Sequence, residues 1–354
     1  MTYMIKSHFA FALLFLINIS VFGQEVEERE VSDWNPDIIG SSVIRGIEFS
    51  YHVNTDYAIS SKSDLYGDGS GKIDKNRIFK TKLRFPILLK NKLKLAGSFE
   101  YSDEEFKFQN IGDNNYPLYR SLNDKNLKSI GGSIYLLSQL KRNMYFMFRF
   151  NGKLKGDYWQ EHLEEVGKYT FLKMEITPVI GWKVNPNKSW GVGIAYSYTF
   201  GDPLIFPVLQ YNQNFSKKWG VEAFLPARIK IRYHPSDLFF VSAKAKLTGG
   251  SYSIHLDDSS LEDFKTLELR RADVNFSLEL EKGITDWLWV SFDAGYRANI
   301  NFDVTNKNHV FGFSGNKLSS QQNIINSNAN GGSFFNFSLF IVPSKTILKK
   351  FGLN

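Results

Sequence analysis

Apolar and polar residues alternate along most of this chain, in stretches of about ten residues. The clearest stretch is RNMYFMFRFNGKLKG, residues 142–156, in which Met144, Phe146 and Phe148 share one face of an extended strand and Arg149 and Asn151 share the other. A period of two with one apolar face is typical of a strand that is buried on one side only. The pattern therefore predicts an all-β protein over residues 43–342.

The connections between these stretches are short and long in turn. We expect short ones at 90–91, 139–142, 185–188, 216–218, 234–237 and 282–286, and long ones at 55–74, 107–126, 155–168, 249–265 and 303–331. In a membrane barrel the short turns face the periplasm and the long loops face the outside. If successive connections lie on alternate sides of the membrane, residues 219–225 and 228–233 must form two strands, with a reversal at Pro226-Ala227. The predicted count is then 14 strands, whereas one strand in this segment would leave a long loop on the wrong side.

Strands of a soluble β-sandwich also alternate apolar and polar residues, so two further features are needed to distinguish a sandwich from a membrane barrel. The expected strands run about 10 to 15 residues, against about 5 or 6 in soluble sheets. Large aromatic residues gather near strand ends, as the interfacial girdles of a membrane barrel require. They are Trp182, Trp190, Tyr198, Phe200, Trp219, Tyr233, Trp287 and Tyr296. We therefore predict a single-chain transmembrane antiparallel β-barrel of about 14 strands, with 12 and 16 as alternatives.

The first 23 residues have the composition of a cleaved secretory signal. Lys6 supplies the positive charge, residues 9–21 form the apolar core, and Val21-Phe22-Gly23 is the expected cleavage site. The apolar core is shorter than the roughly 20 residues of a spanning helix. The sequence thus predicts a signal peptide (1–23), a periplasmic lead-in (24–41), a barrel (42–343) and a C-terminal tail (344–354), and places the protein in the outer membrane.

One part of the chain resembles a known family. The segment 225–233, LPARIKIRY, continues through Pro235-Ser236-Asp237 and a further strand to Gly249-Gly250-Ser251-Tyr252. With these residues the chain is similar to a family of uncharacterised outer-membrane β-barrel proteins of Gram-negative bacteria, described as a domain of unknown function. The resemblance implies the fold and the compartment, and it implies no activity and no catalytic residues.

The residues that could carry chemistry argue against an enzyme and against a metal site. The chain has no cysteine, which excludes thiolate ligands, disulfides and a lipoprotein anchor. Its six histidines form no HExxH motif, and there is no GxSxG motif. His52 is the histidine that the pattern places in a strand, and it is expected to face inward. The acidic stretch 64–74 lacks the spacing of a calcium loop, so we expect no cofactor.

The polar face of the expected strands carries many basic side chains, which should point into the barrel. The candidates for lining the lumen are Lys80, Lys82, Arg84, Lys94, Arg149, Lys153, Arg228, Lys230, Arg232 and Arg271, with Lys92, Lys173, Lys244 and Lys246 on the same face. Acidic residues should partly offset them, namely Glu48, Glu100, Glu175, Glu222, Asp273, Glu279 and Asp293. One interpretation is cross-strand ion pairing in a filled interior. The other is an anion-preferring channel, because rings of basic side chains attract anions.

Three functions remain open at this point. The first is a passive pore or transporter for small polar or anionic solutes, and the second is a non-conducting structural or surface-interaction barrel that acts through its long extracellular loops. The third, an outer-membrane lipid hydrolase, lacks a residue constellation, so we expect no enzyme.

The expected partners follow from the compartment. They are outer-membrane lipid and lipopolysaccharide, small anionic solutes, and the outer-membrane assembly machinery. This machinery often reads an aromatic residue at the end of the last strand; here it would use Phe335, Phe337 and Leu339 within the strand, or the tail itself would pair. The net charge of +7 falls to +6 when Lys6 leaves with the signal, which is too small to argue for nucleic acid.

Overall fold

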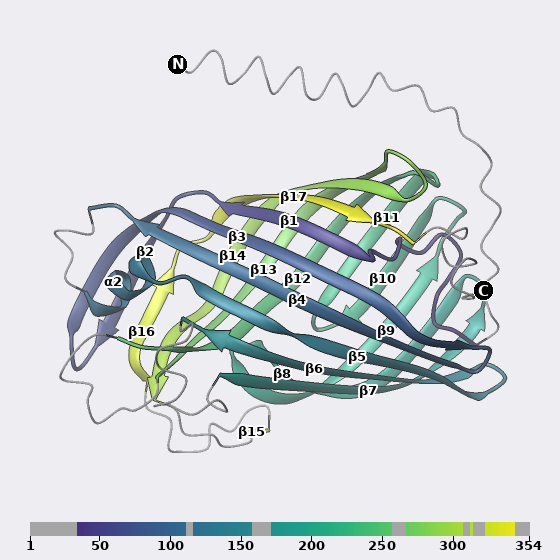
Figure 1. Cartoon of the computed structure of the whole chain (residues 1–354), viewed down its shortest axis with the longest axis horizontal. Helices are drawn as coiled ribbons and strands as arrows, with labels where there is room; N and C mark the ends of the chain where they lie inside the picture. Colours follow the sequence, from purple (N-terminus) through teal and green to yellow (C-terminus); the bar gives the residue numbers. More distant parts are fainter. Residues whose placement is uncertain are drawn as a thin grey trace, which may run out of the picture.

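The computed structural model describes residues 34–110, 116–157, 171–256, 267–306, 312–313 and 323–343. Its strands are β1 (Ile47–Asn54), β2 (Tyr57–Ser63), β3 (Gly67–Lys90), β4 (Leu93–Phe108), β5 (Leu127–Lys141), β6 (Met144–Gly156), β7 (Leu172–Asn185), β8 (Lys188–Phe200), β9 (Asp202–Asn214), β10 (Trp219–Leu225), β11 (Arg228–Ser236), β12 (Phe239–Ile254), β13 (Leu267–Gly283), β14 (Leu288–Asn306), β15 (Gly312–Phe313), β16 (Asn323–Ala329) and β17 (Gly332–Ile341). They form one sheet that closes on itself into a barrel (Figure 1). The described helix is α2 (Pro117–Asp124), and none in the described ranges has the length and hydropathy of a membrane span.

The barrel wall has 14 strands, as predicted. β1 and β2 are one wall strand interrupted at Thr55-Asp56, because both pair with β3 in continuous register. β16 and β17 are likewise two parts of one strand beside β14. The barrel closes where β1 pairs with β17, for example Tyr51 with Phe337. β15 is a two-residue strand that lies parallel to β9 and is not part of this count.

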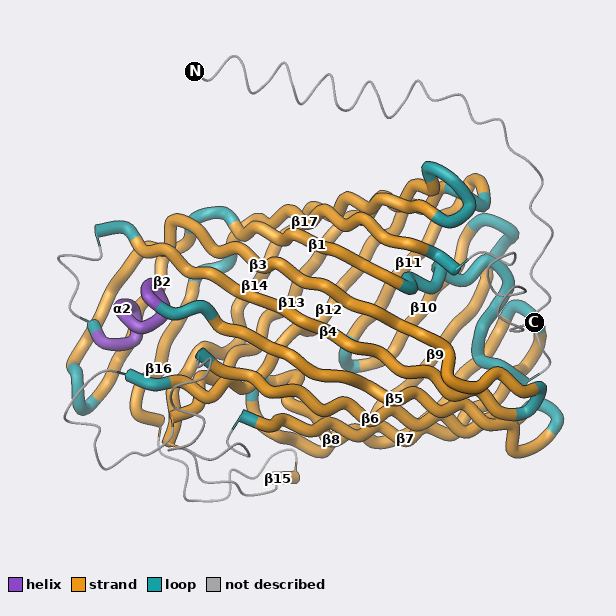
Figure 2. Tube along the Cα trace, viewed as in Figure 1, coloured by secondary structure: helices purple, strands orange, loops and turns teal. Residues whose placement is uncertain are grey.

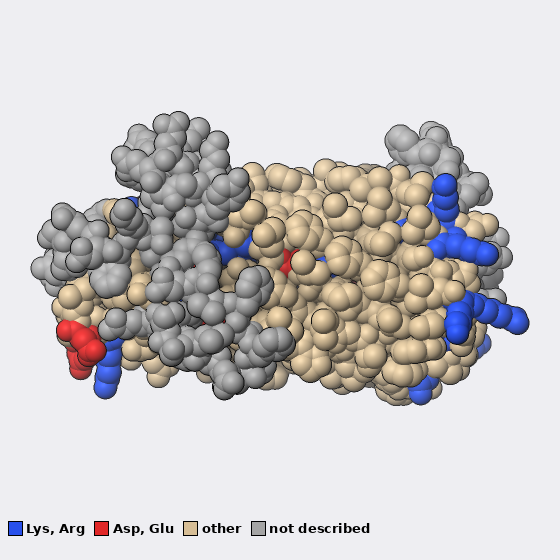
Figure 3. All heavy atoms as spheres, turned by 90° about the horizontal axis from the view of Figure 1, so that it is seen from below, with Lys and Arg blue, Asp and Glu red and all other residues tan. Residues whose placement is uncertain are grey.

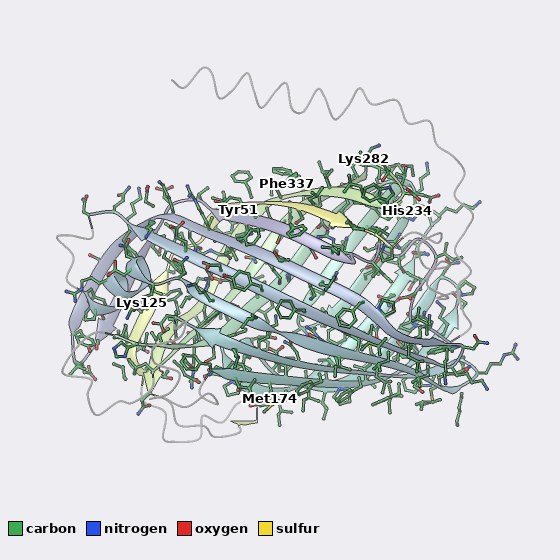
Figure 4. The ribbon with its side chains drawn as sticks, in the orientation of Figure 1. Tyr51, Lys125, Met174, His234, Lys282 and Phe337 are labelled. Carbon is green, nitrogen blue, oxygen red and sulfur yellow. The ribbon has the colours of Figure 1, made fainter. Side chains whose placement is uncertain are left out.

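The outer face of the wall is apolar, which explains the alternating sequence. Tyr51, Phe337 and Met174 point away from the barrel and are 44%, 52% and 46% exposed (Figure 4). In the space-filling view most of the wall is built of uncharged residues, and the charged side chains that are visible lie mainly towards its two ends (Figure 3). An apolar band flanked by polar ends is the surface that a bilayer covers.

The aromatic girdle is confirmed in part. Trp182 stacks on Trp190 with ring centroids 4.6 Å apart, and Trp219 packs on Tyr233 at 4.7 Å. Tyr198 does not belong to the girdle, because it is only 5% exposed and its ring lies under the Lys173 ammonium. The sequence could not distinguish it, since a tyrosine at a strand end looks the same in either position.

The short turns gather at one end of the barrel, which we call the periplasmic end, and the predicted reversal between β10 and β11 is present (Figure 2). The prediction of long loops was wrong in several places. The expected loop 55–74 is a hairpin of β2 and β3, and the expected loop 303–331 contains the end of β14 and β16. These extensions escaped notice because most of their outward positions are Ser, Lys, Asp and Asn rather than apolar residues.

A hydrophobic core fills the barrel at the extracellular end, where the long strands extend beyond the apolar band. α2 lies within this end (Figure 1), and its Leu118 and Tyr119 are fully buried. They pack with residues of β2, β3, β4, β13, β14 and β16, among them Ile59, Phe106 and Phe302. Burial raises the pKa of Tyr116, just before α2, to about 12. The signal peptide, residues 24–33 of the lead-in and the tail 344–354 lie outside the described residues.

Candidate functional site: the barrel lumen

The strand register determines which side chains enter the barrel. The ten basic residues proposed for the lumen all lie on the face opposite the exposed apolar residues: Lys80, Lys82, Arg84, Lys94, Arg149, Lys153, Arg228, Lys230, Arg232 and Arg271. For example, Lys230 faces Glu222 across the β10–β11 pair while the neighbouring Ile231 is 47% exposed to the outside. Seven of the ten make ion pairs with carboxylates of the described interior, and Lys94, Arg149 and Arg228 make none.

One carboxylate in the lumen serves three ammonium groups. Glu100 on β4 accepts from Lys80 at 3.1 Å, from Lys82 at 3.1 Å and from Lys153. The Glu100 side chain is 9% exposed and that of Lys82 is 12% exposed, whereas Lys80 is 38% exposed. One carboxylate against three ammonium groups leaves two uncompensated positive charges at this height of the barrel. The exposure of Lys80 shows that water reaches it from inside the barrel.

A second cluster lies nearer the periplasmic end and is balanced. Arg45 contacts Glu279 at 2.9 Å and Glu281 at 2.7 Å, and Lys230 contacts the same two carboxylates. Lys244 joins Glu279 at 3.1 Å and Asp293 at 2.7 Å. Arg45 also contacts Glu48 on β1 at 2.6 Å, and Glu48 in turn lies 3.8 Å from Arg84 on β3. Four cations and four carboxylates thus tie β11–β14 to β1, to β3 and to the segment that precedes β1. This cluster fits cross-strand ion pairing that rigidifies the wall.

Three further arginines among the candidates are also neutralised. Arg232 lies 3.1 Å from Glu222, and Arg84 lies 3.8 Å from Glu48. Arg271 bridges Glu104 of β4 and Asp273 of β13 across the barrel, just below the extracellular core. These pairs belong to the wall and contribute little free charge to the lumen.

The remaining cations have no carboxylate partner within the described ranges. Lys94 lies over the Trp34 ring at 5.8 Å, and Arg149 lies over the Tyr135 ring at 5.5 Å. Arg228 and Lys246 are directly opposite each other in the β11–β12 register, and both are exposed although they face inward. The charges nearest to Lys246 include Lys80, Lys244 and Arg228, with Glu100 as the acidic one.

Part of the lumen face of β7–β9 is apolar instead. Val179, Ala195, Phe206 and Val208 are buried there, and Phe224 at the tip of β10 packs against them. Membrane barrels that conduct water and ions have polar interiors. This apolar patch, in the same interior as the basic clusters, makes the lumen amphipathic.

The periplasmic mouth is crossed by residues 34–45, which we call the strap. The Trp34 indole donates to the Asn91 carbonyl at 3.0 Å at the β3–β4 turn, and Ser189 on β8 donates to the Pro36 carbonyl at 2.6 Å. Farther along, Asn214 on β9 donates to the Ile39 carbonyl at 2.8 Å. Trp34 and Ile38 are 5% and 3% exposed, so the strap is packed into the mouth rather than lying loose below it.

The sequence pattern missed the strap and two members of the balanced cluster. Residues 24–41 have no periodicity and were expected only to lead into the barrel. Arg45 and Glu281 were absent from the predicted lumen set, although Glu281 continues the inward series that includes Glu279. A tryptophan in an aperiodic acidic segment, Trp34, was the one available signal that this segment packs against something.

The described residues hold no group of three or more His, Cys, Asp or Glu that could bind a metal. The predicted inward position of His52 is observed, since its ring stacks on Phe334 at 4.9 Å and bonds Asn54 at 3.1 Å. Asp68 and Asp74, in the stretch considered for calcium, are part of the paired strand β3.

A family model described as "Domain of unknown function (DUF6268)" matches residues 43–334. A search of curated proteins finds no match. Among solved structures, the COG4313 outer membrane channel from Pseudomonas putida F1 is similar over 89% of this chain and 100% of its own, at 10% identity and a TM-score of 0.36. The toluene transporter TodX from P. putida is similar over 84% and 90%, at 8% identity and a TM-score of 0.30. The outer membrane protease OmpT from Escherichia coli is similar over 85% and 99%, at 8% identity and 0.27. These similarities are too distant to transfer a solute or an activity.

Proposed function

Since the chain belongs to the DUF6268 family, whose function is unknown, we propose its function from the lumen: a narrow pore or transporter for small polar or anionic solutes in the outer membrane. The observation that carries this proposal is the charge around Glu100. Three ammonium groups share one carboxylate there, in an interior that water reaches at Lys80. A surplus of positive charge inside a low-dielectric wall concentrates anions and repels cations.

The packed core at the extracellular end favours one alternative. Leu118 and Tyr119 are fully buried in the hydrophobic core of that end, and the strap covers part of the other. A barrel closed in both places would be a non-conducting surface protein. We favour transport because a permanently closed barrel gives no reason for the uncompensated cations at its centre.

The third possibility, a lipid hydrolase, has less support. His52 faces the lumen and its contacts are Asn54 and Phe334, while a hydrolase acting on membrane lipid needs its histidine beside a serine at the lipid-facing surface. His52 is instead a packed residue of the barrel wall.

Solute entry into proteoliposomes tests the proposal. Gluconate and glucose have nearly the same size and differ in charge, so the ratio of their entry rates measures charge preference. We expect gluconate to enter faster, and Lys80→Gln or Lys153→Gln to lower the ratio. Arg77→Gln is the matched control, because Arg77 lies on the outer face of the same strand as Lys80. Equal entry of both solutes would contradict anion preference, and entry of neither would favour the closed barrel.

A further inference from the structure

Across the lumen from the Glu100 cluster, the wall carries positive charge without a counter-ion. Arg228 on β11 and Lys246 on β12 are directly opposite each other in the strand register. Both face inward and both are exposed, so open space lies around their charged groups inside the barrel. Neither makes an ion pair with a carboxylate in the part of the chain that the structure describes. Like charges at directly opposed positions destabilise a sheet, so an anion between them would stabilise this pair.

Lys80, a member of the Glu100 cluster, converges on this pair from β3. Several strands separate β3 from β12 in both directions around the barrel, yet Lys80 is the cation that repels Lys246 most strongly. Its effect exceeds that of Lys244 on the same strand and of Arg228 opposite it. Coulomb repulsion falls with distance, so the Lys80 and Lys246 ammonium groups approach each other within the lumen. The strongest attraction on Lys246 comes from Glu100, which three ammonium groups already share.

β6 brings two more cations to this part of the lumen. Lys153 binds Glu100, and two residues farther along the strand Lys155 lies over the Tyr252 ring of β12 at 5.3 Å. The backbone of β12 leaves room for this contact, because a Cβ on Gly250 would lie only 2.7 Å from the Lys155 ammonium nitrogen. Tyr252 in turn packs against the extracellular core. The cations therefore gather from β3, β6, β11 and β12 beneath the core that fills the extracellular end.

The kind of cation and the surplus of charge favour one class of anion. A carboxylate brings one negative charge, whereas a phosphate monoester brings nearly two at neutral pH, with three strong acceptor oxygens. A guanidinium such as that of Arg228 binds two oxygens of a phosphoryl group side by side, and the ammonium groups of Lys80 and Lys246 act on the group as point charges. A second negative charge on the ligand interacts with all three cations, so the site favours a dianion over a monoanion.

From this arrangement we infer that Arg228, Lys246 and Lys80 form a phosphoryl site, which binds the dianion of phosphate or of a phosphate monoester inside the lumen. The inference rests on the proposed function, because it names the class of solute that an anion-attracting lumen would carry. The guanidinium holds the phosphoryl oxygens from β11, and the two ammonium groups approach them from β12 and β3. Lys80 is available to the ligand because Glu100 keeps its two less exposed ammonium partners.

Equilibrium dialysis of radiolabelled glucose 6-phosphate against the full protein in detergent micelles tests this site at about pH 7.5, where the phosphoryl group is largely a dianion. We expect saturable binding for which glucose does not compete. Glucuronate carries a carboxylate in place of the phosphoryl group and should compete at least about tenfold more weakly, as expected for the loss of one charge-assisted contact. Inorganic phosphate distinguishes the two sources of the phosphoryl group. Competition equal to that of the ester assigns the site to free phosphate, and weaker competition assigns it to phosphate monoesters.

Two single variants locate the binding. Arg228→Gln and Lys246→Gln should each weaken it at least about tenfold, because each removes one charge-assisted contact with the ligand. The control Lys90→Gln removes one positive charge from an exposed position at a periplasmic turn and should leave the affinity unchanged. Loss of Arg228 or Lys246 relieves like-charge repulsion and breaks no ion pair of the described structure. Both variants should therefore fold, which the heat-dependent gel shift of the barrel reports.

Three results would overturn the phosphoryl site: no saturable binding, an unchanged affinity in both variants, or competition by glucuronate as strong as by unlabelled glucose 6-phosphate. Dialysis requires no conduction, so the site and the pore can fail separately. If gluconate enters proteoliposomes faster than glucose but the phosphate ester does not bind, the pore stands and the phosphoryl site is wrong. Binding of the ester without entry of any solute would support the site and contradict the pore.

Discussion

The Glu100 cluster gives the sharpest test of how the lumen is held together. In Glu100→Gln the carboxylate is replaced by a neutral amide of the same size, and Lys82 and Lys153 lose their partner. A charge-assisted hydrogen bond contributes about 1.5–3 kcal/mol. Lys80 adds at most about 1 kcal/mol, because its side chain is 38% exposed. Two such bonds and the weaker third sum to about 3–7 kcal/mol. Removal of one partner of a buried pair typically costs about 3–5 kcal/mol, so we expect the free energy of unfolding to fall by about that amount.

Urea unfolding in detergent micelles, followed by tryptophan fluorescence, measures this change. The matched control is Glu105→Gln on the same strand, where the carboxylate is 34% exposed and lies 3.9 Å from Lys107. It should cost less than about 1 kcal/mol. A loss below about 1 kcal/mol for Glu100→Gln would refute the reasoning, because the lumen would then be wet enough to solvate all three lysines.

Three other predictions concern the two ends of the barrel. Trp34→Ala/Ile38→Ala should loosen the strap, so that Ser189→Cys, the single thiol in a chain without cysteine, reacts faster with a maleimide; an unchanged rate would mean that the strap does not cover the mouth. Leu118→Ala, at a fully buried site on α2, should cost about 2–5 kcal/mol in urea unfolding, and a negligible loss would show that the core is loosely packed. The hydrogen bond and charge of Lys72 lower the pKa of Asp56, so this pair should stabilise the fold above the unfolded pKa of about 3.9 and lose its effect as the pH falls through the lower folded pKa. Acid unfolding of Asp56→Asn should therefore lack this small contribution, and a pH profile identical to the wild type would contradict it.

The wall could be predicted because a membrane imposes a simple rule on it. Wherever lipid covers the barrel, outward positions must be apolar, and residues such as Phe146, Phe337 and Leu278 follow that rule at every second position. Even the separation of β10 from β11 followed from the need for an even count. The extensions of β2, β3 and β14 stand above the lipid, where no such rule applies, so their strands looked like loops.

The interior was less predictable because its chemistry depends on distances between strands far apart in the chain. The pattern could place Lys80, Lys153 and Glu100 on the inward face, but it could not show that all three meet. The same holds for the strap, whose contacts with Asn91, Ser189 and Asn214 join it to three different hairpins. A period of two reports which face a residue occupies and gives no information about what lies across a lumen.

The claim that the lumen prefers anions is tested most directly by the reversal potential of the refolded protein in a planar bilayer under a KCl gradient. We predict discrete conductance steps whose reversal potential has the sign of chloride selectivity, and a shift toward zero in Lys80→Gln. A reversal potential at zero, or one with the sign of potassium selectivity, would contradict the account, because the charge surplus around Glu100 would then have no effect on the ions that pass.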